Sequence, residues 1–175
     1  MKISVLGIAF AAILTATANA QIATTDAKKS TSLFTIREDG LKKADFATGN
    51  SPLSTTRASR DFSSRFKNAG NAKWYEMKNG LIAKFDENGK AIKAFYDRNG
   101  RWFYTIATYG ESKLPVDVRK QVKSVYYDYT IDVVIEVNVD DKTAYLVKME
   151  DEKTLKTIRV VDGEMDVYED YLKGY

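Results

Sequence analysis

Cysteine and histidine are both absent from the 175 residues of this chain. A thiol nucleophile, a Ser-His-Asp triad and a zinc site built from Cys or His each require at least one of them. An exported domain without disulfides must also be stable through packing alone. These absences exclude the commonest nucleophilic enzymes and the commonest zinc sites.

Carboxylates are the main remaining candidates for catalysis. Acidic clusters occur at Asp140-Asp141, Glu150–Glu152 and Glu169-Asp170, and a pair of carboxylates can hydrolyse glycosides. The first two clusters fall at predicted hairpin tips, where acidic side chains are ordinary turn residues. Asp86–Gly89 lacks the spacing and the distal Glu of a calcium loop, and no glycine-rich phosphate loop is present. We therefore expect a protein that is not an enzyme and holds no metal or cofactor.

The balance of charge argues against nucleic acid as a partner. Lys and Arg number 27 against 24 Asp and Glu, which gives a net charge of +3. Nucleic-acid-binding domains concentrate basic side chains on one face. The sequence shows no such concentration.

Residues 1–20 have the pattern of a secretory signal peptide. Lys2 is followed by the apolar run Ile3–Leu14 and by Ala18-Asn19-Ala20, a typical cleavage site. The run is shorter than the roughly 20 apolar residues that span a bilayer. We expect export to the periplasm or the medium and no transmembrane segment in the mature chain; an N-terminal core helix is the alternative.

The next stretch, residues 21–57, is rich in Thr, Ser, Lys and Asp. This composition predicts a polar, flexible leader between the cleavage site and the domain. Only Leu33–Ile36 has the character of a strand, so a short strand or a partner-binding motif remains an alternative there. The domain itself is predicted over residues 58–175.

Residues 72–109 predict an antiparallel meander. Four short apolar and aromatic runs are separated by Asn79-Gly80, Asn88-Gly89 and Asn99-Gly100, and Asn-Gly between such runs is the strongest local hairpin signal. Loops of three residues would pair Met77 with Leu81, and so on through the meander. Loops of two residues would shift the register by one and exchange the faces.

With three-residue loops, the two faces of the meander differ in character. The predicted core face carries large apolar side chains alternating with Ala: Tyr75, Met77, Leu81, Ala83, Phe85, Ala91, Phe95, Phe103 and Ala107. The predicted open face mixes rings with charges: Trp74, Glu76, Ile82, Lys84, Asp86, Ile92, Tyr96, Trp102 and Tyr104.

The rest of the domain repeats this organisation. Apolar spacing predicts helices over residues 58–69 and 115–129. Period-two alternation and turn residues predict strands over residues 131–139, 144–149, 155–161 and 165–168, followed by a tail. The order and spacing of the two halves indicate a duplicated helix-plus-meander unit. The predicted fold class is α+β, with one sheet of about eight strands and two helices on one face.

A resemblance follows from these motifs. The chain resembles the PepSY-like family in four features. They are a helix before the strand of Trp74, Asn-Gly hairpins, Leu114-Pro115-Val116-Asp117-Val118 opening a second helix, and a strand-rich half with Asp162-Gly163. That family is similar in fold to beta-lactamase inhibitor protein, which binds its target with an open sheet face. The resemblance implies a small exported bacterial domain that binds or restrains another protein. The chain lacks the cysteines of the inhibitor itself, so its target is not carried over.

The binding hypothesis concerns the predicted open face. We expect a surface for an exported protein or peptide, formed by Trp74, Glu76, Lys84, Tyr96, Trp102 and Tyr104. Trp and Tyr are enriched among interface residues whose truncation is costly. The alternatives are that these rings are core, or that the leader, the tail or a second protomer covers them. A structural or envelope-interaction domain without a discrete site is the alternative function.

Overall fold

The described strands of the computed structural model form a single antiparallel sheet of nine strands, in chain order from β1 to β9. The structure describes residues 42–44 and 53–174, all within one compact unit, Phe34–Tyr175. The predicted signal peptide and most of the predicted leader lie outside the described residues. The strands are β1 (Lys42–Lys43), β2 (Lys73–Met77), β3 (Gly80–Glu87), β4 (Lys90–Asp97), β5 (Trp102–Tyr109), β6 (Thr130–Val139), β7 (Lys142–Glu150), β8 (Thr154–Val161) and β9 (Glu164–Leu172).

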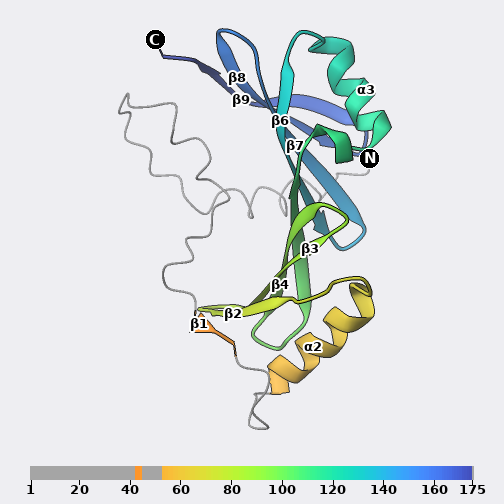
Figure 1. Cartoon of the computed structure of the whole chain (residues 1–175), viewed down its shortest axis with the longest axis vertical. Helices are drawn as coiled ribbons and strands as arrows, with labels where there is room; N and C mark the ends of the chain where they lie inside the picture. The colour runs from red at the N-terminus through yellow and green to blue at the C-terminus, as the bar shows by residue number, and fades with distance from the viewer. Residues whose placement is uncertain (1–41, 45–52, 175) are drawn as a thin grey trace, which may run out of the picture. The chain divides into compact units, whose positions relative to one another are not determined.

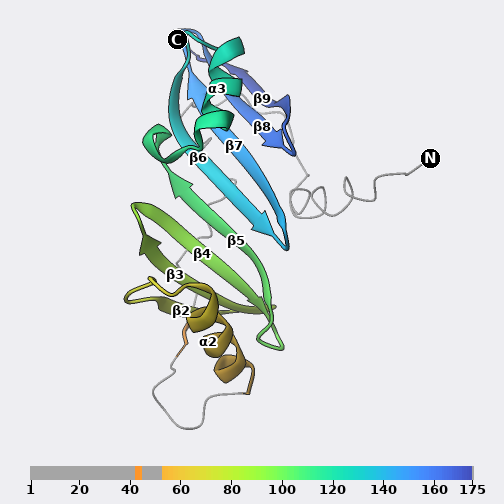
Figure 2. The ribbon, with the colours of Figure 1, turned by 90° about the vertical axis from the view of Figure 1, so that its right-hand side faces the viewer.

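Two helices lie on one side of this sheet. Helix α2 (Leu53–Arg65) precedes β2, and the 3₁₀ turn η2 (Glu111–Lys113) and helix α3 (Val116–Val125) precede β6. In Figure 1 both helices lie to the right of the sheet, and in Figure 2 both lie in front of it. The predicted α+β class with two helices on one face is confirmed. No described helix has the length and hydropathy needed to cross a membrane.

Helix boundaries differ from those predicted. Helix α2 begins at Leu53, inside the predicted leader, and ends at Arg65. Helix α3 stops at Val125, four residues before the predicted end, and Pro115 is its N-cap residue. In both cases apolar residues beyond the helix continue the same spacing, so periodicity alone does not mark the end.

The Asn-Gly hairpins are present, but the first two have shorter loops than predicted. Met77 pairs with Gly80 and Glu87 with Lys90, so each loop has two residues. In the second loop Asn88 and Gly89 have φ values of 52° and 75°, the left-handed pair that a type I′ turn requires. The third loop is the three-residue type that was predicted, because the Asp97 amide donates to the Arg101 carbonyl at 2.9 Å.

These loop lengths reassign the faces of β2 and β4. Trp74 is opposite Ala83, and Ala83 is opposite Ala94, so these three side chains share the helix-covered face. The prediction placed Tyr75 and Phe95 there, which is wrong. In β5 a register shift leaves Phe103 as the extra residue of a bulge, and its side chain is 54% exposed.

Aromatic packing under α2 forms one part of the core. The Phe62 ring centroid lies 5.2 Å from that of Trp74 and 5.1 Å from that of Phe85. Phe66 lies 4.9 Å from Phe85. Because Ala83 and Ala94 have small side chains, the sheet beneath this cluster leaves room for the helix.

Strand β9 continues to Leu172, where a polar tail was predicted. Its sequence has weak apolar alternation, so its pairing with β8 depends on charges as well. Arg159 and Asp166 are cross-strand partners with nitrogen and oxygen 2.9 Å apart, and Lys156 forms an ion pair with Asp170. Such pairs stabilise strands only in the register that the rest of the sheet imposes.

Candidate binding face of the sheet

The side of the sheet that faces away from α2 and α3 is strongly apolar, and we call it the apolar face. Strand register places Tyr75, Ile82, Phe95 and Tyr104 in one row across β2–β5. Further apolar side chains from β5 to β8 extend the face: Ile106, Ile135, Val137, Ala144, Leu146 and Val161. The face thus runs across both halves of the sheet.

Aromatic side chains form one end of the apolar face. The rings of Phe95 and Tyr104 are stacked, with centroids 4.2 Å apart and an interplanar angle of 16°. The Lys84 ammonium lies 4.8 Å from the centroid of the Tyr75 ring, within the range of a cation–π interaction. Burial raises the pKa of the Tyr104 hydroxyl. These contacts hold flat, rigid rings at defined positions.

The charges on the apolar face are chiefly basic near its centre. Lys84 and Lys93 are direct cross-strand neighbours on β3 and β4, and Lys148 lies on the same face of β7. Three lysines therefore lie among the apolar and aromatic side chains of this face.

Several apolar side chains of this face are nearly inaccessible. Ile82 is 0% exposed and Leu146 is 2% exposed, although no helix among the described residues lies on this side of the sheet (Figure 2). Residues at the centre of the helix-covered face, such as Val147, are buried to the same degree.

The six residues predicted to form a binding surface do not share one face. Lys84 and Tyr104 lie on the apolar face. Trp74, Tyr96 and Trp102 lie on the opposite side: Trp74 contacts Phe62 of α2 and Tyr96, with ring centroids 5.2 Å and 5.5 Å apart.

Trp102 and Tyr96 are held by residues of α2 or of the sheet. The Arg65 guanidinium lies 4.2 Å from the Trp102 ring, and the Trp102 indole donates to Thr105 Oγ1 at 2.9 Å. Tyr96 is 2% exposed, and burial and the nearby Asp61 carboxylate raise the pKa of its hydroxyl. The prediction that Trp74, Tyr96 and Trp102 face solvent is wrong. The two-residue loops exchange the two faces of β2 and β4 relative to β3, so Trp74 and Tyr96 lie on the helix-covered face, and Trp102 is opposite Tyr96.

Glu76 remains exposed on the helix side of β2. It lines a shallow hollow of about 230 Å³ with Thr55, Leu81 and Arg98 among others. The binding role of all six residues stays a hypothesis, but they cannot act as one continuous surface.

A polar network at the joint between the two halves was not predicted. Glu136 of β6 accepts hydrogen bonds from Lys90 of β4 at 2.8 Å and from Tyr109 of β5 at 2.6 Å. Asn138 donates to the same carboxylate at 3.0 Å. Burial opposes ionisation of Glu136, but these donors outweigh it, so its pKa is lowered. The sequence holds no signal for the network, because its members are brought together only by sheet register.

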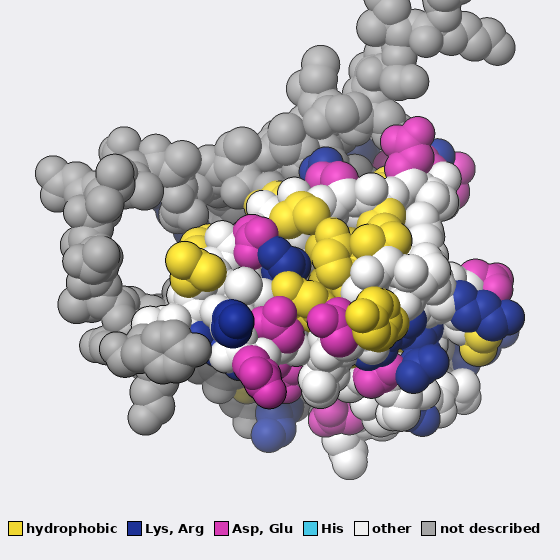
Figure 3. All heavy atoms as spheres, turned by 90° about the horizontal axis from the view of Figure 1, so that it is seen from above, with side chains coloured by type: hydrophobic (Ala, Val, Ile, Leu, Met, Phe, Trp, Pro, Cys, Tyr) yellow, Lys and Arg dark blue, Asp and Glu magenta, His cyan; other side chains and the backbone are white. Residues whose placement is uncertain are grey.

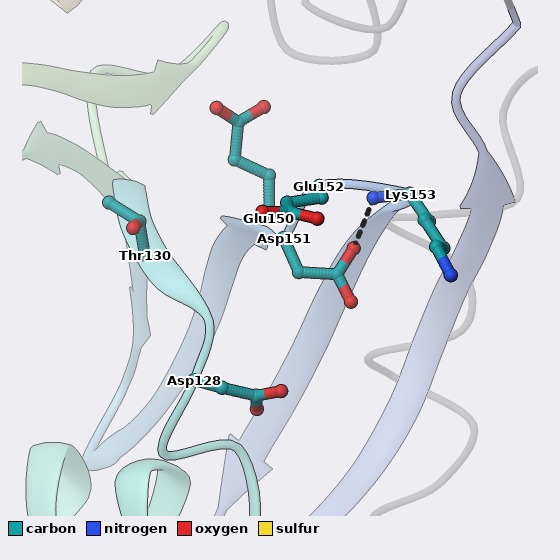
Figure 4. Close-up of a pocket in the computed structure, with 6 residues that line it drawn as sticks. All are labelled: Asp128, Thr130, Glu150, Asp151, Glu152 and Lys153. Carbon is teal, nitrogen blue, oxygen red and sulfur yellow. Dashed lines mark hydrogen bonds between the residues drawn. The ribbon is translucent and has the colours of Figure 1, made fainter.

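A second hollow on the described surface lies at the β7–β8 hairpin, beside the turn that follows α3. It has a volume of about 580 Å³, and Figure 4 shows its lining residues. They are Asp128, Thr130, Glu150, Asp151, Glu152 and Lys153.

Two carboxylates of this hollow, those of Asp151 and Glu150, have partners within the protein. Asp151 accepts hydrogen bonds from the amides of Lys153 and Thr154 at 2.8 and 2.6 Å; the first is drawn in Figure 4. These bonds lower the pKa of Asp151 to about 2. Glu150 pairs with Lys173 at 3.1 Å. No group of acidic residues in the described part of the chain has the arrangement of a metal site.

The surface near α3 carries charges of both signs. Figure 3 shows that hydrophobic, acidic and basic side chains are mixed over this end of the molecule.

Known proteins resemble this chain in structure only. No protein-family model and no curated protein matches it. It is similar to a BLIP-like protein from Bacteroides fragilis NCTC 9343, with 20% identity and a TM-score of 0.56 over 73% of this chain and 92% of that chain. It is also similar to a DUF2874 family protein from Bacteroides uniformis ATCC 8492, with 14% identity and a TM-score of 0.52 over 66% and 87% of the two chains.

A third solved structure is from Bacteroides eggerthii DSM 20697, and its description assigns that protein provisionally to the periplasm. It shares 16% identity and a TM-score of 0.52 over 71% of this chain and 90% of that chain. At these identities the likeness shows the fold alone. The expected fold, similar to that of beta-lactamase inhibitor protein, is confirmed.

Proposed function

We propose that this protein is an exported, non-enzymatic binding module that holds a segment of another exported protein against the apolar face. One observation carries the proposal: a sheet face with stacked aromatic rings and central lysines lies opposite both described helices.

The chemistry of the face defines the partner. Tyr104, stacked on the buried Phe95 ring, and Tyr75 offer rigid aromatic side chains at the end of the face, and truncation of such residues in interfaces commonly costs about 2 kcal/mol or more. The partner segment is therefore one that presents apolar side chains. By inhibiting or sequestering its partner, the module would restrain another protein in the envelope.

Export and family membership belong to the same proposal. The pattern of Lys2, Ile3–Leu14 and Ala18–Ala20 supports a cleaved signal peptide and a periplasmic or extracellular location. The motifs around Leu114-Pro115 support membership of the PepSY-like family. The order of a helix followed by four strands occurs twice, at α2–β5 and at α3–β9, which supports an internal duplication.

The experiment compares two charge reversals of equal size. Envelope proteins are captured with the wild type, with Lys84→Glu/Lys93→Glu on the apolar face, and with Lys113→Glu/Lys120→Glu on the helix side. We expect one captured protein to be retained by the wild type and the helix-side variant and lost from the apolar-face variant, each shown to be folded by circular dichroism at the temperature of the experiment. Retention by both variants, or loss from both, would contradict the proposal.

A structural or envelope-interaction domain is the second candidate, and strand β9 favours it. Among the described strands β9 pairs only with β8, and it carries Val167, Tyr171 and Leu172, which are 48%, 51% and 83% exposed. An exposed edge of this kind can pair with another chain. Concentration-dependent assembly that Val167→Lys abolishes would favour this function.

A further inference from the structure

Strand β9 forms a border of the sheet (Figure 2), and among the described strands it pairs only with β8. The Lys173 amide donates to the Lys153 carbonyl at 2.8 Å. In an antiparallel pair, the backbone groups of successive residues point alternately toward and away from the neighbouring strand. The amide and carbonyl groups of Leu172 and Asp170 therefore point away from β8, toward the position of a further strand.

The two sides of β9 differ in chemistry. On the helix side, Val167 is opposite the core residue Ile158 and is 48% exposed, and Leu172 is 83% exposed. Asp170 lies on this side too, in an ion pair with Lys156. The other side is chiefly acidic, with Glu164, Asp166 and Glu169 opposite Val161, Arg159 and Thr157. The edge is thus mainly apolar on one side and mainly acidic on the other.

Helix α3 adds an apolar side chain beside this edge. The Gln121 side chain donates to the carbonyl of Gly163, in the β8–β9 turn, at 2.7 Å. Val125 lies one turn further along the same side of α3, and it is 56% exposed. Val125 and Val167 therefore both border the helix side of the edge, where apolar side chains of an added strand would cover them.

We infer that β9 binds an extended segment of another protein as an additional strand, and that this segment alternates apolar with basic residues. This goes beyond the proposed function, because it concerns the edge of the sheet and a partner chemistry that the apolar face does not select. In strand addition, main-chain hydrogen bonds provide affinity and alternate side chains provide specificity. The apolar residues of the segment lie on the side of Val167, and its basic residues lie on the side of Glu164 and Asp166.

The charge of β9 selects such a segment over a second copy of this chain. From Glu164 to Leu172 the strand has four acidic residues and no basic one. Strand β8 offers only Lys156 and Arg159, which already pair with acids of β9, so negative charge remains in excess. Pairing two copies of β9 would bring acids against acids, and like charges opposed across strands destabilise a sheet. The strand also lacks lysine and proline, which commonly block pairing at sheet edges.

The probe is a short synthetic peptide of alternating lysine and valine, added to the full chain and followed by NMR and calorimetry. Its counterpart alternates glutamate and valine. We expect the lysine peptide to shift the amide signals of Asp170 and Leu172, and to bind about tenfold more tightly than the glutamate peptide. The lysine peptide with every amide N-methylated should not bind, because it cannot donate to the edge. Equal binding of the methylated peptide, or of the two charged peptides, would overturn the inference.

A charge swap in β9 tests the chemistry of the partner. Glu164→Lys/Glu169→Lys should weaken binding of the lysine peptide about tenfold and strengthen binding of the glutamate peptide, because the opposed charges are exchanged. Asp86→Lys/Asp132→Lys is the matched control, since both acids are exposed on other strands, and it should bind as the wild type does. Circular dichroism establishes that both variants are folded. An unchanged preference in the swap variant, or loss of both peptides, would overturn the inference.

Sedimentation of the wild-type chain without peptide separates this inference from the second candidate function. We expect a monomer, because the acids of β9 oppose pairing between copies. Concentration-dependent assembly that Val167→Lys abolishes would support that candidate and overturn the inference. The capture experiment on the apolar face changes no residue of β9, so its failure would leave the inference standing.

Discussion

Lys90 Nζ lies 2.8 Å from Glu136 Oε2, although 46 positions separate the two residues in the chain. Lys90 belongs to the first helix-plus-meander half and Glu136 to the second. Tyr109 donates to the same carboxylate oxygen at 2.6 Å, and the Lys90 ammonium lies 4.2 Å from the Tyr109 ring. The pair therefore ties β4, β5 and β6 together where the two halves of the sheet meet.

Replacing Glu136 with Gln should lower the free energy of unfolding by about 1–3 kcal/mol. The substitution removes a charge-assisted acceptor from two half-buried donors while keeping the shape of the side chain. Urea denaturation measures the loss. Glu111→Gln is the matched control, because the Glu111–Arg119 pair is more exposed and should cost only about 0–1 kcal/mol.

The same carboxylate predicts a pH dependence. Because the pKa of Glu136 is lowered in the folded state, its stabilising effect is complete above the unfolded value of about 4.3. The effect is lost as the pH falls through the folded pKa. The difference in unfolding free energy between wild type and Glu136→Gln should thus shrink below about pH 4. A constant difference down to pH 3 would contradict this assignment.

Gly80→Ala should prevent the first hairpin from closing. The residue has φ of 151°, and a Cβ atom built there would lie 1.9 Å from the Tyr96 carbonyl oxygen. The backbone conformation alone costs an L residue roughly 1–3 kcal/mol, and the clash adds to this. Thermal unfolding of Gly80→Ala and of Gly110→Ala tests the prediction, since the second glycine has open space around it. Equal melting temperatures would contradict it.

Phe62→Ala should lower the free energy of unfolding by about 3–5 kcal/mol, as for other buried aromatic truncations. Its ring packs against Trp74, Phe66 and Phe85, so a cavity would open beneath α2. Chemical denaturation gives the size of the loss, and a red shift of the tryptophan emission would report wetting of Trp74. Ser63→Ala, exposed on the same helix, should have little effect on either signal.

The Asp151 carboxyl group should titrate near its pKa of about 2. The amides of Lys153 and Thr154 and the Thr154 hydroxyl bond its ionised form, so protonation requires breaking these bonds. Carbon-detected NMR of the carboxyl group measures the titration. Thr154→Val should raise the pKa, whereas Thr154→Ser, which keeps the hydroxyl, should leave it nearly unchanged; equal values in the two variants would contradict this account.

The sequence predicts correctly which residues of β3 face the core, but not which residues of β4 do. The predicted core residues of β3, Leu81, Ala83 and Phe85, are in the core, because alternation alone defines which residues share a face. The predicted core residues of β4 were wrong, because one fewer residue in the loop before it reverses every side chain. Asn88-Gly89 can form either loop, and the sequence does not distinguish them.

The candidate site was also predicted only in part, because it depends on the same strand faces. The aromatic residues and lysines do lie in the sheet, as predicted. Trp74 and Trp102 contact α2, however, and of the six residues only Lys84 and Tyr104 lie on the apolar face. The Glu136 network could not have been predicted, since its partners belong to three strands whose register depends on the whole sheet.

Local chemistry determined the elements: Asn-Gly pairs form turns, apolar alternation forms strands, and the absence of Cys and His excludes whole classes of site. Which ring packs under α2 and which lies on the apolar face was decided only by the tertiary structure. The physical reason is that side chains alternate with a period of two, so a difference of one residue in a loop exchanges the two faces of the following strand. Only packing of the helices against one of those faces selects the loop that is formed.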